Sequence, residues 1–458
     1  MPVDLVIRNG TVVTGDETFA AGIAIDKGRI VAVATENYLP PALKDLDAGG
    51  MYVMPGLIDA HVHFRTPGLE HKEDLTTGSI GAAVGGVTCV LDMPNTVPLT
   101  ASSAIVALRQ RLIAESSYVD VMLVGVLIPD NGGEIVPMAE SGVVGYKVYL
   151  GESVGGIATP DDGQLLDYMA DVANTGLRFA FHAESGPILR HAQAKVRVAG
   201  RTDGAAFAES RPVIAEVEAI HRVCLFASHT GAKIHILHLS SKDGLNAIRE
   251  WRRKGVDVTA ETAPQYLFLT HDDLVQQGSR LRCNPPVRTA DDAAELYRGL
   301  LDGDIDMIAT DHAPHTDAEK TASDIWQAMS GITGVETAAA LVLSEAVNTR
   351  GMTLERFVNV SSVNPARVWG VWPRKGALVV GADADVTIVD LKRDWVIDEK
   401  TLHSKNKVSV WHGRSGRGKP VSTIIGGRPV VVNGELVAAQ PSGRLVNPVR
   451  PERRDGFA

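Results

Sequence analysis

The sequence predicts an α/β protein: a (β/α)8 TIM-like barrel with a small β-sandwich formed from both ends of the chain. In the centre, short apolar runs alternate with amphipathic helical stretches, whereas both ends show only short strand patterns separated by turn residues. Strands that alternate with helices favour parallel pairing, and eight such units fit a closed barrel. A doubly wound open sheet shows the same alternation and is the competing arrangement.

Both ends of the chain have the composition of short β-strands. Two all-β segments at opposite ends of a chain can pair into one small unit, because chain termini often lie close together. We therefore expect residues 1–55 and 371–458 to form the sandwich and residues 56–370 to form the barrel. The strands expected here are Leu5–Arg8, Thr11–Thr14, Gly22–Asp26, Ile30–Ala34, Met51–Met54, Ala384–Val389 and Val421–Ile425, with Gly426-Gly427 as a turn.

The central region supplies eight apolar runs of strand length, most of them followed by a helical pattern. The runs are Leu57–His63, Val87–Met93, Val119–Leu127, Val143–Leu150, Arg178–Glu184, Lys233–Ser240, Asp257–Ala263 and Asp306–Ala313. The clearest helical patterns are Ser103–Ser116, Asp162–Asn174, Val213–His229, Asp243–Lys254 and Asp291–Leu301.

Composition limits the classes of partner. The chain has 458 residues and a net charge of −10, which argues against nucleic acid and anionic membranes, since both require a basic face. Its three cysteines lack metal-binding or disulfide spacing, and no apolar run approaches the ~20 residues of a membrane helix. No signal-peptide pattern is visible in the N-terminal residues, so we expect a cytoplasmic enzyme.

Residues able to bind a metal stand at the C-terminal ends of five predicted strands. In a barrel this is the catalytic face, where residues distant in sequence converge. The six candidates are His61, His63, Lys147, His182, His238 and Asp311.

The residue types in this set suit a divalent ion. His61 and His63 form an H-x-H pair, whose side chains share one face of a strand, and imidazole and carboxylate are common ligands of zinc and similar ions. Lys147 is unusual in such a set, because an ammonium would repel the cations. It is either a paired structural lysine or a lysine carbamylated by CO2, which would supply a bridging carboxylate to a two-metal site.

The chain resembles the cyclic amidohydrolases of the amidohydrolase superfamily, which include dihydroorotases, allantoinases, hydantoinases and dihydropyrimidinases. The resemblance extends over nearly the whole chain. Its motifs are PGLIDAHVHFR (55–65), DMPNT (92–96), GYKVYLGES (145–153), HAES (182–185), HILHLSS (235–241), ETAPQYL (261–267), CNPPVR (283–288), ATDHAPHT (309–316) and GADADVTIVDL (381–391).

This resemblance implies a centre of two divalent ions, expected to be zinc. It implies that His61, His63 and Asp311 bind one ion, that His182 and His238 bind the other, and that carbamylated Lys147 bridges them. Asp311 would also act as the general base. The resemblance further implies a small cyclic amide as substrate, hydrolysis of a cyclic C–N bond, and a homodimer or homotetramer.

The loops that would contact the substrate resemble dihydroorotases. In those enzymes the residues at the positions of Arg65, Asn95 and His315 hold a carboxylate, which an arginine can bind bidentately. Asn284 is a candidate to hydrogen-bond the ring amide. Hydantoinases carry a tyrosine five positions after the lysine, where this chain has Glu152. These loops favour a dihydroorotase, which interconverts dihydroorotate and N-carbamoyl-aspartate in pyrimidine biosynthesis.

Other segments resemble allantoinases and hydantoinases, notably ESRPVIAEVEAIHRV (209–223) and ETAPQYLFL (261–269). The alternative is therefore an allantoinase or a hydantoinase/dihydropyrimidinase that opens a neutral cyclic ureide. A more remote alternative is an inactive structural relative, but such proteins lose metal ligands, and this chain keeps all six positions.

Overall fold

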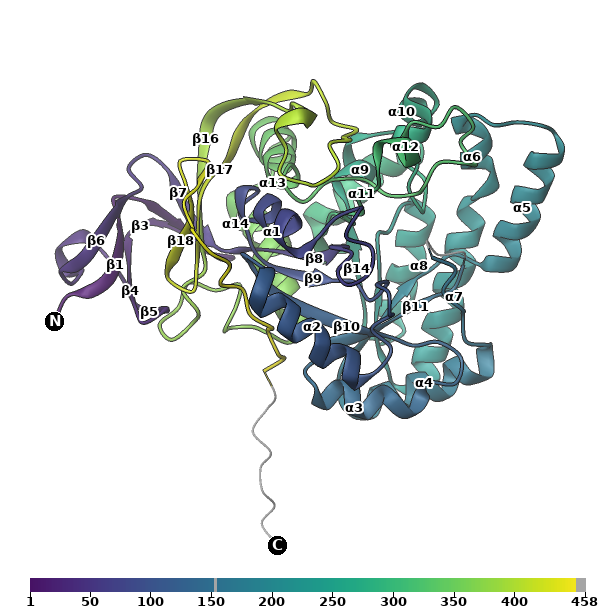
Figure 1. Cartoon of the computed structure of the whole chain (residues 1–458), viewed down its shortest axis with the longest axis horizontal. Helices are drawn as coiled ribbons and strands as arrows, with labels where there is room; N and C mark the ends of the chain where they lie inside the picture. The colour runs from purple at the N-terminus through teal and green to yellow at the C-terminus, as the bar shows by residue number, and fades with distance from the viewer. Residues whose placement is uncertain (152–154, 450–458) are drawn as a thin grey trace, which may run out of the picture.

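The computed structural model describes residues 1–151 and 155–449, and its centre is a sheet of eight strands with parallel neighbours in consecutive order. The expected barrel fold is confirmed, with helices around the strands (Figure 1). The strands are β8 (Leu57–Val62), β9 (Val87–Asp92), β10 (Asp120–Val126), β11 (Gly145–Tyr149), β12 (Arg178–His182), β13 (Lys233–Ile236), β14 (Val258–Thr262) and β15 (Met307–Ile308).

The first and last strands close the barrel through a few specific contacts. Val62 forms a parallel bridge with His312, and the backbone N–H of His63 donates to the His312 carbonyl at 2.8 Å. The buried Asp59 carboxylate accepts from the Thr310 backbone N–H at 3.0 Å and from the Thr310 hydroxyl at 2.6 Å. These contacts show a closed sheet and exclude the doubly wound alternative.

The principal helices lie on the outside of the barrel, as the sequence pattern predicts. Their ends carry the expected signals: the Asp161 side chain caps α4 at its N-terminus, and Gly176, with φ of 75°, ends it. The longer helices are α1 (Leu75–Val84), α2 (Ser103–Ser116), α4 (Asp162–Thr175), α5 (Gly186–Val198), α7 (Val213–Thr230), α8 (Lys242–Arg253) and α11 (Ala290–Asp302).

Side chains alternate between the inside and the outside of the barrel. On β10, Met122 and Val124 join a buried cluster whose members come from many barrel strands, while Val121 and Leu123 join the cluster that includes the helices. Trp369, 1% exposed, belongs to the inner cluster. The interior is therefore a packed core, which leaves the C-terminal ends of the strands as the place for a cavity.

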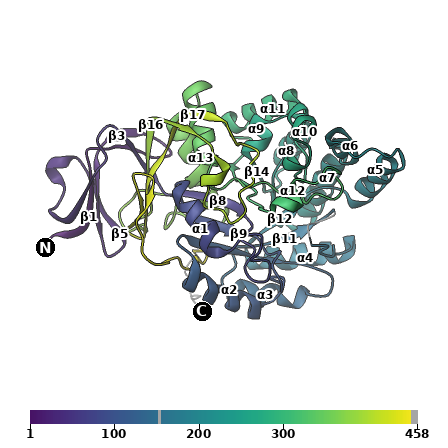
Figure 2. The same ribbon diagram turned by 45° about the horizontal axis from the view of Figure 1, so that its top comes forward.

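The sandwich packs a four-stranded sheet on a seven-stranded one, and strands from both ends of the chain contribute to the larger sheet. Its N-terminal strands lie at one end of the molecule, with the C-terminal strands between them and the barrel (Figures 1 and 2). The strands are β1 (Val3–Arg8), β2 (Thr11–Val13), β3 (Thr18–Ala20), β4 (Gly22–Asp26), β5 (Arg29–Ala34), β6 (Ala42–Asp47), β7 (Tyr52–Pro55), β16 (Val386–Val396), β17 (Ser415–Ile425), β18 (Arg428–Val432) and β19 (Glu435–Leu436).

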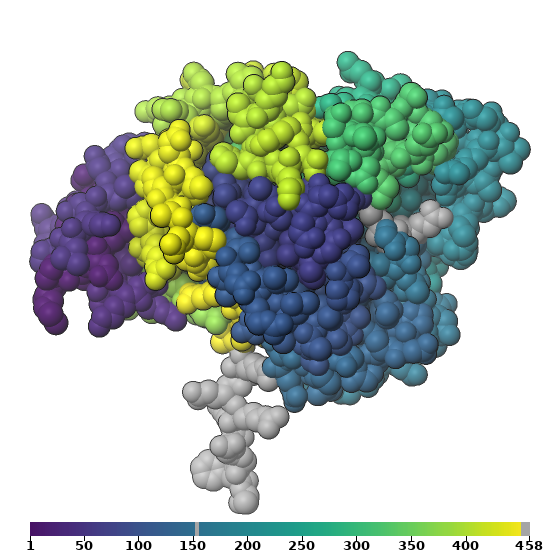
Figure 3. All heavy atoms as spheres, in the orientation of Figure 1, coloured from purple at the N-terminus to yellow at the C-terminus, as the bar shows by residue number. Residues whose placement is uncertain are grey.

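Four of these strands were not among those expected from the sequence: β3, β6, β18 and β19. β3 and β6 are largely exposed and lack the apolar alternation that reveals a half-buried strand. The Gly426-Gly427 turn is present between β17 and β18, and both glycines have positive φ. On the face shown in Figure 3, the yellow residues near the C-terminus form a band between the purple N-terminal part and the blue part of the barrel.

A buried ion cluster joins the barrel to the sandwich. Lys375 Nζ lies 2.5 to 3.0 Å from carboxylate oxygens of Asp120, Asp383 and Asp385. Burial by itself opposes the charge on Lys375, yet the three carboxylates hold its pKa above the usual range. The three aspartates have the spacing of a metal site, but the lysine already occupies their centre.

Removing this lysine should destabilise the protein strongly. Lys375→Met leaves three buried carboxylates without a cation, and we expect a loss of about 3–5 kcal/mol in the free energy of unfolding. Chemical denaturation measures it, with the exposed Lys44→Met, expected within about 0.5 kcal/mol of wild type, as control. Equal stabilities of the two variants would contradict a structural role for the cluster.

None of the described helices is long and apolar enough to span a bilayer. From its Arg and Pro content, we expect the C-terminal tail Pro448–Ala458 to be extended or to form a subunit contact. Its residues 450–458 lie outside the described residues.

Candidate metal centre

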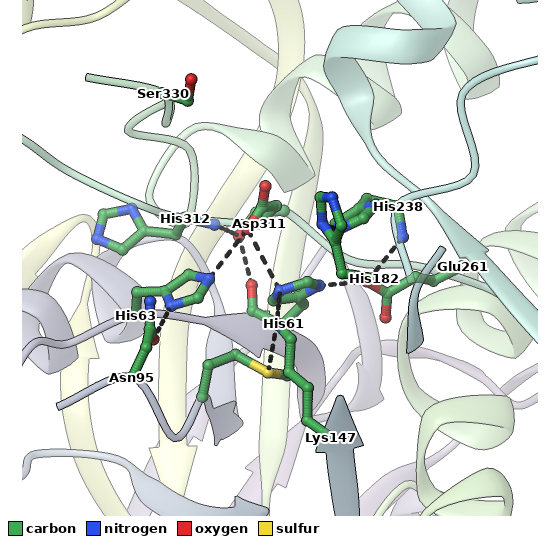
Figure 4. Close-up of polar contacts among 12 residues, drawn as sticks. His61, His63, Asn95, Lys147, His182, His238, Glu261, Asp311, His312 and Ser330 are labelled. Atoms are coloured by element: carbon green, nitrogen blue, oxygen red, sulfur yellow. Dashed lines mark hydrogen bonds and ion pairs between the residues drawn. The ribbon is translucent and has the colours of Figure 1, made fainter. Parts of the chain in front are cut away.

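The six residues predicted to bind metal line one cavity at the C-terminal ends of the barrel strands (Figure 4). Two lie within their strands, one ends its strand and the rest follow within three residues of the strand end. All are at most 8% exposed. They are His61 and His63 at β8, Lys147 in β11, His182 at the end of β12, His238 after β13 and Asp311 after β15.

Three of the residues converge on one point. The Nε2 atoms of His61 and His63 lie 3.3 and 3.1 Å from the same oxygen, Oδ1 of Asp311. Val62, between the two histidines, points instead into the apolar core. One carboxylate oxygen and two imidazole nitrogens therefore face one another as the ligands of a single ion would.

Two further histidines form a second group beside the first. Nδ1 of His182 and Nε2 of His238 lie 2.9 Å apart. Lys147 Nζ lies 3.2 Å from Nε2 of His61, and the His61 and His238 rings are stacked at 5.4 Å. Lys147 thus contacts the first group. The stacked rings of His61 and His238 place the second group directly beside the first.

Hydrogen bonds to the other ring nitrogens fix three of the imidazoles. His61 Nδ1 pairs with Glu261, His63 Nδ1 lies 2.6 Å from Asn95 Oδ1, and His182 Nε2 lies 2.9 Å from Glu184 Oε2. A carboxylate or amide oxygen at the outer nitrogen sets the tautomer and directs the lone pair of the inner nitrogen to the cavity.

The backbone at the site departs from common conformations. Arg65, His238 and Asp311 have φ values of 62°, 39° and 50°, a region that residues other than glycine seldom adopt. Conformations of this kind persist only where the surrounding structure holds them, and they concentrate at functional sites.

Burial sets the protonation states. It lowers the pKa of His63 to about 4 and that of His238 to about 3, so both rings are neutral at physiological pH. For Asp311, burial opposes ionisation, but the adjacent His63 ring and the positive charge of nearby Lys147 hold its pKa below the ordinary value. Burial also lowers the pKa of Lys147 to about 8, so the neutral amine is readily available.

These donors fit a divalent metal centre. Neutral imidazoles and an ionised carboxylate are the ligands such ions prefer, and among the described residues no lysine or arginine lies within 4 Å of the Asp311 carboxylate on which they converge. In the cluster of Asp120, Asp383 and Asp385, by contrast, the ammonium of Lys375 already lies among the carboxylates. An amine that is easily deprotonated beside the ligands fits a lysine that can be converted into an anion.

Three of the four residues expected to contact the substrate also line the cavity: Arg65, Asn95 and Asn284. Arg65 is 2% exposed, its Nε has no hydrogen-bond partner, and no carboxylate within 4 Å pairs with it among the described residues. Asn284 Oδ1 is likewise buried without a partner there. The cavity wall therefore holds an uncompensated positive charge and a free amide acceptor.

The fourth, His315, lies behind Arg65 and does not line this cavity. Lys72 Nζ lies 3.1 Å from its Nδ1, and an ammonium only donates, so Nδ1 must accept. Nε2 then carries the hydrogen and donates to the Ser330 carbonyl at 3.1 Å. Burial lowers the pKa of His315 to about 3, so the ring is a neutral spacer whose two nitrogens are already engaged.

Sequence reasoning missed several residues of the site. Tyr149 and Ser330 line the cavity, and Glu261 orients His61. The position of Tyr149 could have been inferred, because it follows Lys147 by two residues on a strand and so shares its face. Ser330 lies far along the chain from any strand end, and no local pattern marks it. Glu152 lies outside the described residues.

Glu184 makes two contacts at the site, an ion pair with Arg211 and a hydrogen bond with His182. The ion pair is bidentate, and the same carboxylate holds His182. The charge of Arg211 overcomes the effect of burial and keeps the pKa of Glu184 far below its usual value. Glu184 therefore remains an anion beside the ring that it orients.

Comparisons of the sequence and of the structure with known proteins point to the same family. The model of the amidohydrolase family matches residues 52–430. An allantoinase of Solibacter usitatus is 38% identical over 447 residues, covering 97% of each chain, and an L-hydantoinase of Paenarthrobacter aurescens is 35% identical, covering 97% of this chain and 98% of the other. The solved L-hydantoinase (dihydropyrimidinase) from Arthrobacter aurescens superposes with a TM-score of 0.95 at 34% identity, covering 97% of this chain and all of the other.

Proposed function

The chain belongs to the amidohydrolase family, and from this premise we propose that it opens the ring of a neutral cyclic ureide of the allantoin or hydantoin type. Its relatives are hydrolases that act on cyclic amides, and the chain is a cyclic amidohydrolase. The observation that carries the proposal is the cavity in which four histidines, an aspartate and a lysine converge.

The choice of ring departs from the main expectation drawn from the sequence. The loops favoured a dihydroorotase, whereas the relatives found along the full chain are allantoinases and an L-hydantoinase. These relatives support the alternative, a neutral ureide, which the scaffold segments 209–223 and 261–269 also favour.

We propose that two divalent ions, zinc by preference, occupy the cavity. His61, His63 and Asp311 would hold one, His182 and His238 the other, and a carbamate on Lys147 would bridge them. When bound, such ions lower the pKa of a shared water from ~15.7 to about 7 and polarise a carbonyl oxygen.

The carbamate follows from the chemistry of Lys147. Its neutral amine, accessible because burial lowers the pKa to about 8, bonds through nitrogen to the carbon of CO2 and loses one proton to solvent. The product carries one negative charge where an ammonium would carry a positive one. His61, whose Nε2 lies 3.2 Å from Lys147 Nζ, then faces an anion instead of an ammonium.

Asp311 is the proposed general base. As the attacking oxygen bonds to the carbonyl carbon, the Asp311 carboxylate accepts its proton. The same carboxyl delivers that proton to the ring nitrogen as the C–N bond breaks, so the products are a carboxylate and an open-chain amide nitrogen. The unpaired Asn284 Oδ1 would accept a hydrogen bond from a ring N–H.

A side-by-side assay tests the proposal. Purified protein loaded with zinc is offered allantoin, hydantoin, dihydrouracil and dihydroorotate, and kcat/KM is measured for each. We expect allantoin or hydantoin to exceed the others roughly tenfold or more. Turnover of dihydroorotate alone would show that the substrate is the carboxylate-bearing ring instead. A protein that binds no metal and opens none of the rings would support the alternative of an inactive structural relative.

One observation favours a second candidate, a ring bearing a carboxylate such as dihydroorotate. A buried guanidinium without an anionic partner is costly unless its ligand supplies the anion, and Arg65 is in this position beside Asn95. His315 would act here by packing behind Arg65, with its Nε2 3.4 Å from Arg65 Nη2, rather than by direct contact with the substrate.

Arg65→Ala distinguishes the two candidates. Because truncating one partner of a buried charge pair costs about 2–5 kcal/mol, we expect kcat/KM for any carboxylate-bearing ring to fall about 100-fold or more. Turnover of a neutral ring should fall far less. The exposed Arg111→Ala serves as control. Equal losses on both kinds of ring would remove Arg65 as a carboxylate-binding residue.

The proposed partner is thus a small ring, and from the net charge of −10 we expect neither nucleic acid nor an anionic membrane as a partner. A homodimer or homotetramer in the cytoplasm remains our prediction, and light scattering of the purified protein measures the oligomeric state.

A further inference from the structure

The phenol of Tyr149 is a hydrogen-bond donor without a partner. Tyr149 is the last residue of β11 and is 6% exposed, and its Oη is buried with no hydrogen bond among the described residues. A buried hydroxyl that bonds to nothing in the protein is uncommon, because it has lost water and gained no substitute. The Tyr149 Oη is therefore a candidate to form a hydrogen bond with a bound ligand.

Other buried tyrosines of the barrel do not share this feature. Tyr168 donates to the Ile128 carbonyl at 3.2 Å and Tyr266 to the Pro285 carbonyl at 2.8 Å, while Tyr146 donates to the Ile135 carbonyl. The fold thus satisfies its phenols where they serve packing alone. It leaves unpaired the one that lines the metal cavity.

Tyr149 lies directly beside the reacting groups. Lys147 Nζ sits over its ring, 4.6 Å from the centroid, and the His182 ring lies 6.0 Å away. An ordinary phenol has a pKa of about 10 and keeps its proton at neutral pH. The phenol is therefore a neutral O–H donor at the cavity wall.

We propose that the Tyr149 hydroxyl donates a hydrogen bond to the carbonyl oxygen of the amide that is cleaved. As the nucleophile bonds to the carbonyl carbon, the C=O π electrons move onto this oxygen, and the bond from Tyr149 strengthens with the developing charge. The tyrosine keeps its proton throughout, and the oxygen's electrons return when the C–N bond breaks. A donor placed in advance at such an oxygen accelerates acyl transfer. The inference rests on the proposed ring-opening function and adds to it a catalytic residue.

The test compares Tyr149→Phe and Tyr149→Leu with Tyr168→Phe, which removes a phenol that is bonded to backbone away from the cavity. For each, kcat and KM are measured on the ring that the wild-type enzyme opens fastest, together with zinc per chain and the melting temperature. For Tyr149→Phe we expect kcat to fall about 100-fold. KM, zinc content and melting temperature should stay near the wild-type values, because no bond within the protein is lost.

The matched variants identify the hydroxyl as the active group. Tyr149→Leu should lose as much kcat as Tyr149→Phe, whereas Tyr168→Phe should lose melting temperature and keep kcat. A fully active Tyr149→Phe, an effect confined to KM, or a loss that tracks lost zinc would overturn the proposal. A wild-type enzyme that opens none of the four rings would instead contradict the ring-opening function itself, and the role of Tyr149 with it.

Discussion

Asp311→Asn is expected to lower kcat about 1,000-fold or more, because an amide keeps the shape of the carboxylate but accepts no proton. The Oδ1 atom of Asp311 is the point toward which Nε2 of both His61 and His63 is directed. The substitution therefore touches metal binding as well as proton transfer. Steady-state kinetics and metal analysis of the same sample measure both effects.

The metal content assigns the loss. If both ions remain, the lost step is proton transfer, and if the ion of His61 and His63 leaves, the carboxylate acts mainly as its ligand. Asp317→Asn, an exposed position six residues further on, controls for the loss of a negative charge nearby. An Asp311→Asn enzyme with wild-type kcat would contradict both roles.

Lys147→Ala should reduce activity by a similar factor, about 1,000-fold, since it removes the only anion proposed to bridge the two ions. The void left by the side chain can admit a small carboxylate. Acetate or propionate added to the variant should therefore restore part of the activity, while chloride at equal ionic strength should not.

The wild-type enzyme offers a second test of the same group. Metal-free protein that is reloaded with zinc in buffer stripped of CO2 should stay nearly inactive until bicarbonate is added. Full activity without bicarbonate, together with an active Lys147→Ala, would show that the lysine remains a plain amine.

The candidate metal-binding residues could be predicted because they stand where strands end. Parallel strands of a barrel present their C-terminal ends on one face, so six residues scattered from His61 to Asp311 had to converge once the strands were recognised. Their partners were less accessible. Glu261 and Asn95 reach the histidines through contacts between neighbouring strands and loops, which depend on register rather than on local sequence.

The closure of the barrel shows the same limit. Alternating strands and helices are compatible with an open sheet, and the eighth strand is reduced to Met307–Ile308. The contacts that complete the ring are those of Asp59 with Thr310 and of Val62 with His312, which are far apart in the chain. Only the folded structure reveals them.

Substrate choice was the least predictable property. Arg65 and Asn95 have the residue types of a carboxylate site, and the structure keeps both at the cavity. His315, which completes that set in the sequence, is instead held by Lys72 and the Ser330 carbonyl. The residue types indicated which side chains lie near the cavity. Whether a given side chain such as His315 faces the substrate depends on the hydrogen bonds that it makes within the protein.

The central claim is that the six side chains together bind two ions bridged by a modified lysine. A crystal structure of the zinc-loaded enzyme with anomalous diffraction data tests it most directly. We predict two anomalous peaks about 3.5–4 Å apart, one beside His61, His63 and Asp311 and the other beside His182 and His238, with density for a carbamate continuous with Lys147 Nζ. A single peak, or an unmodified amine at Lys147 in fully active crystals, would contradict it.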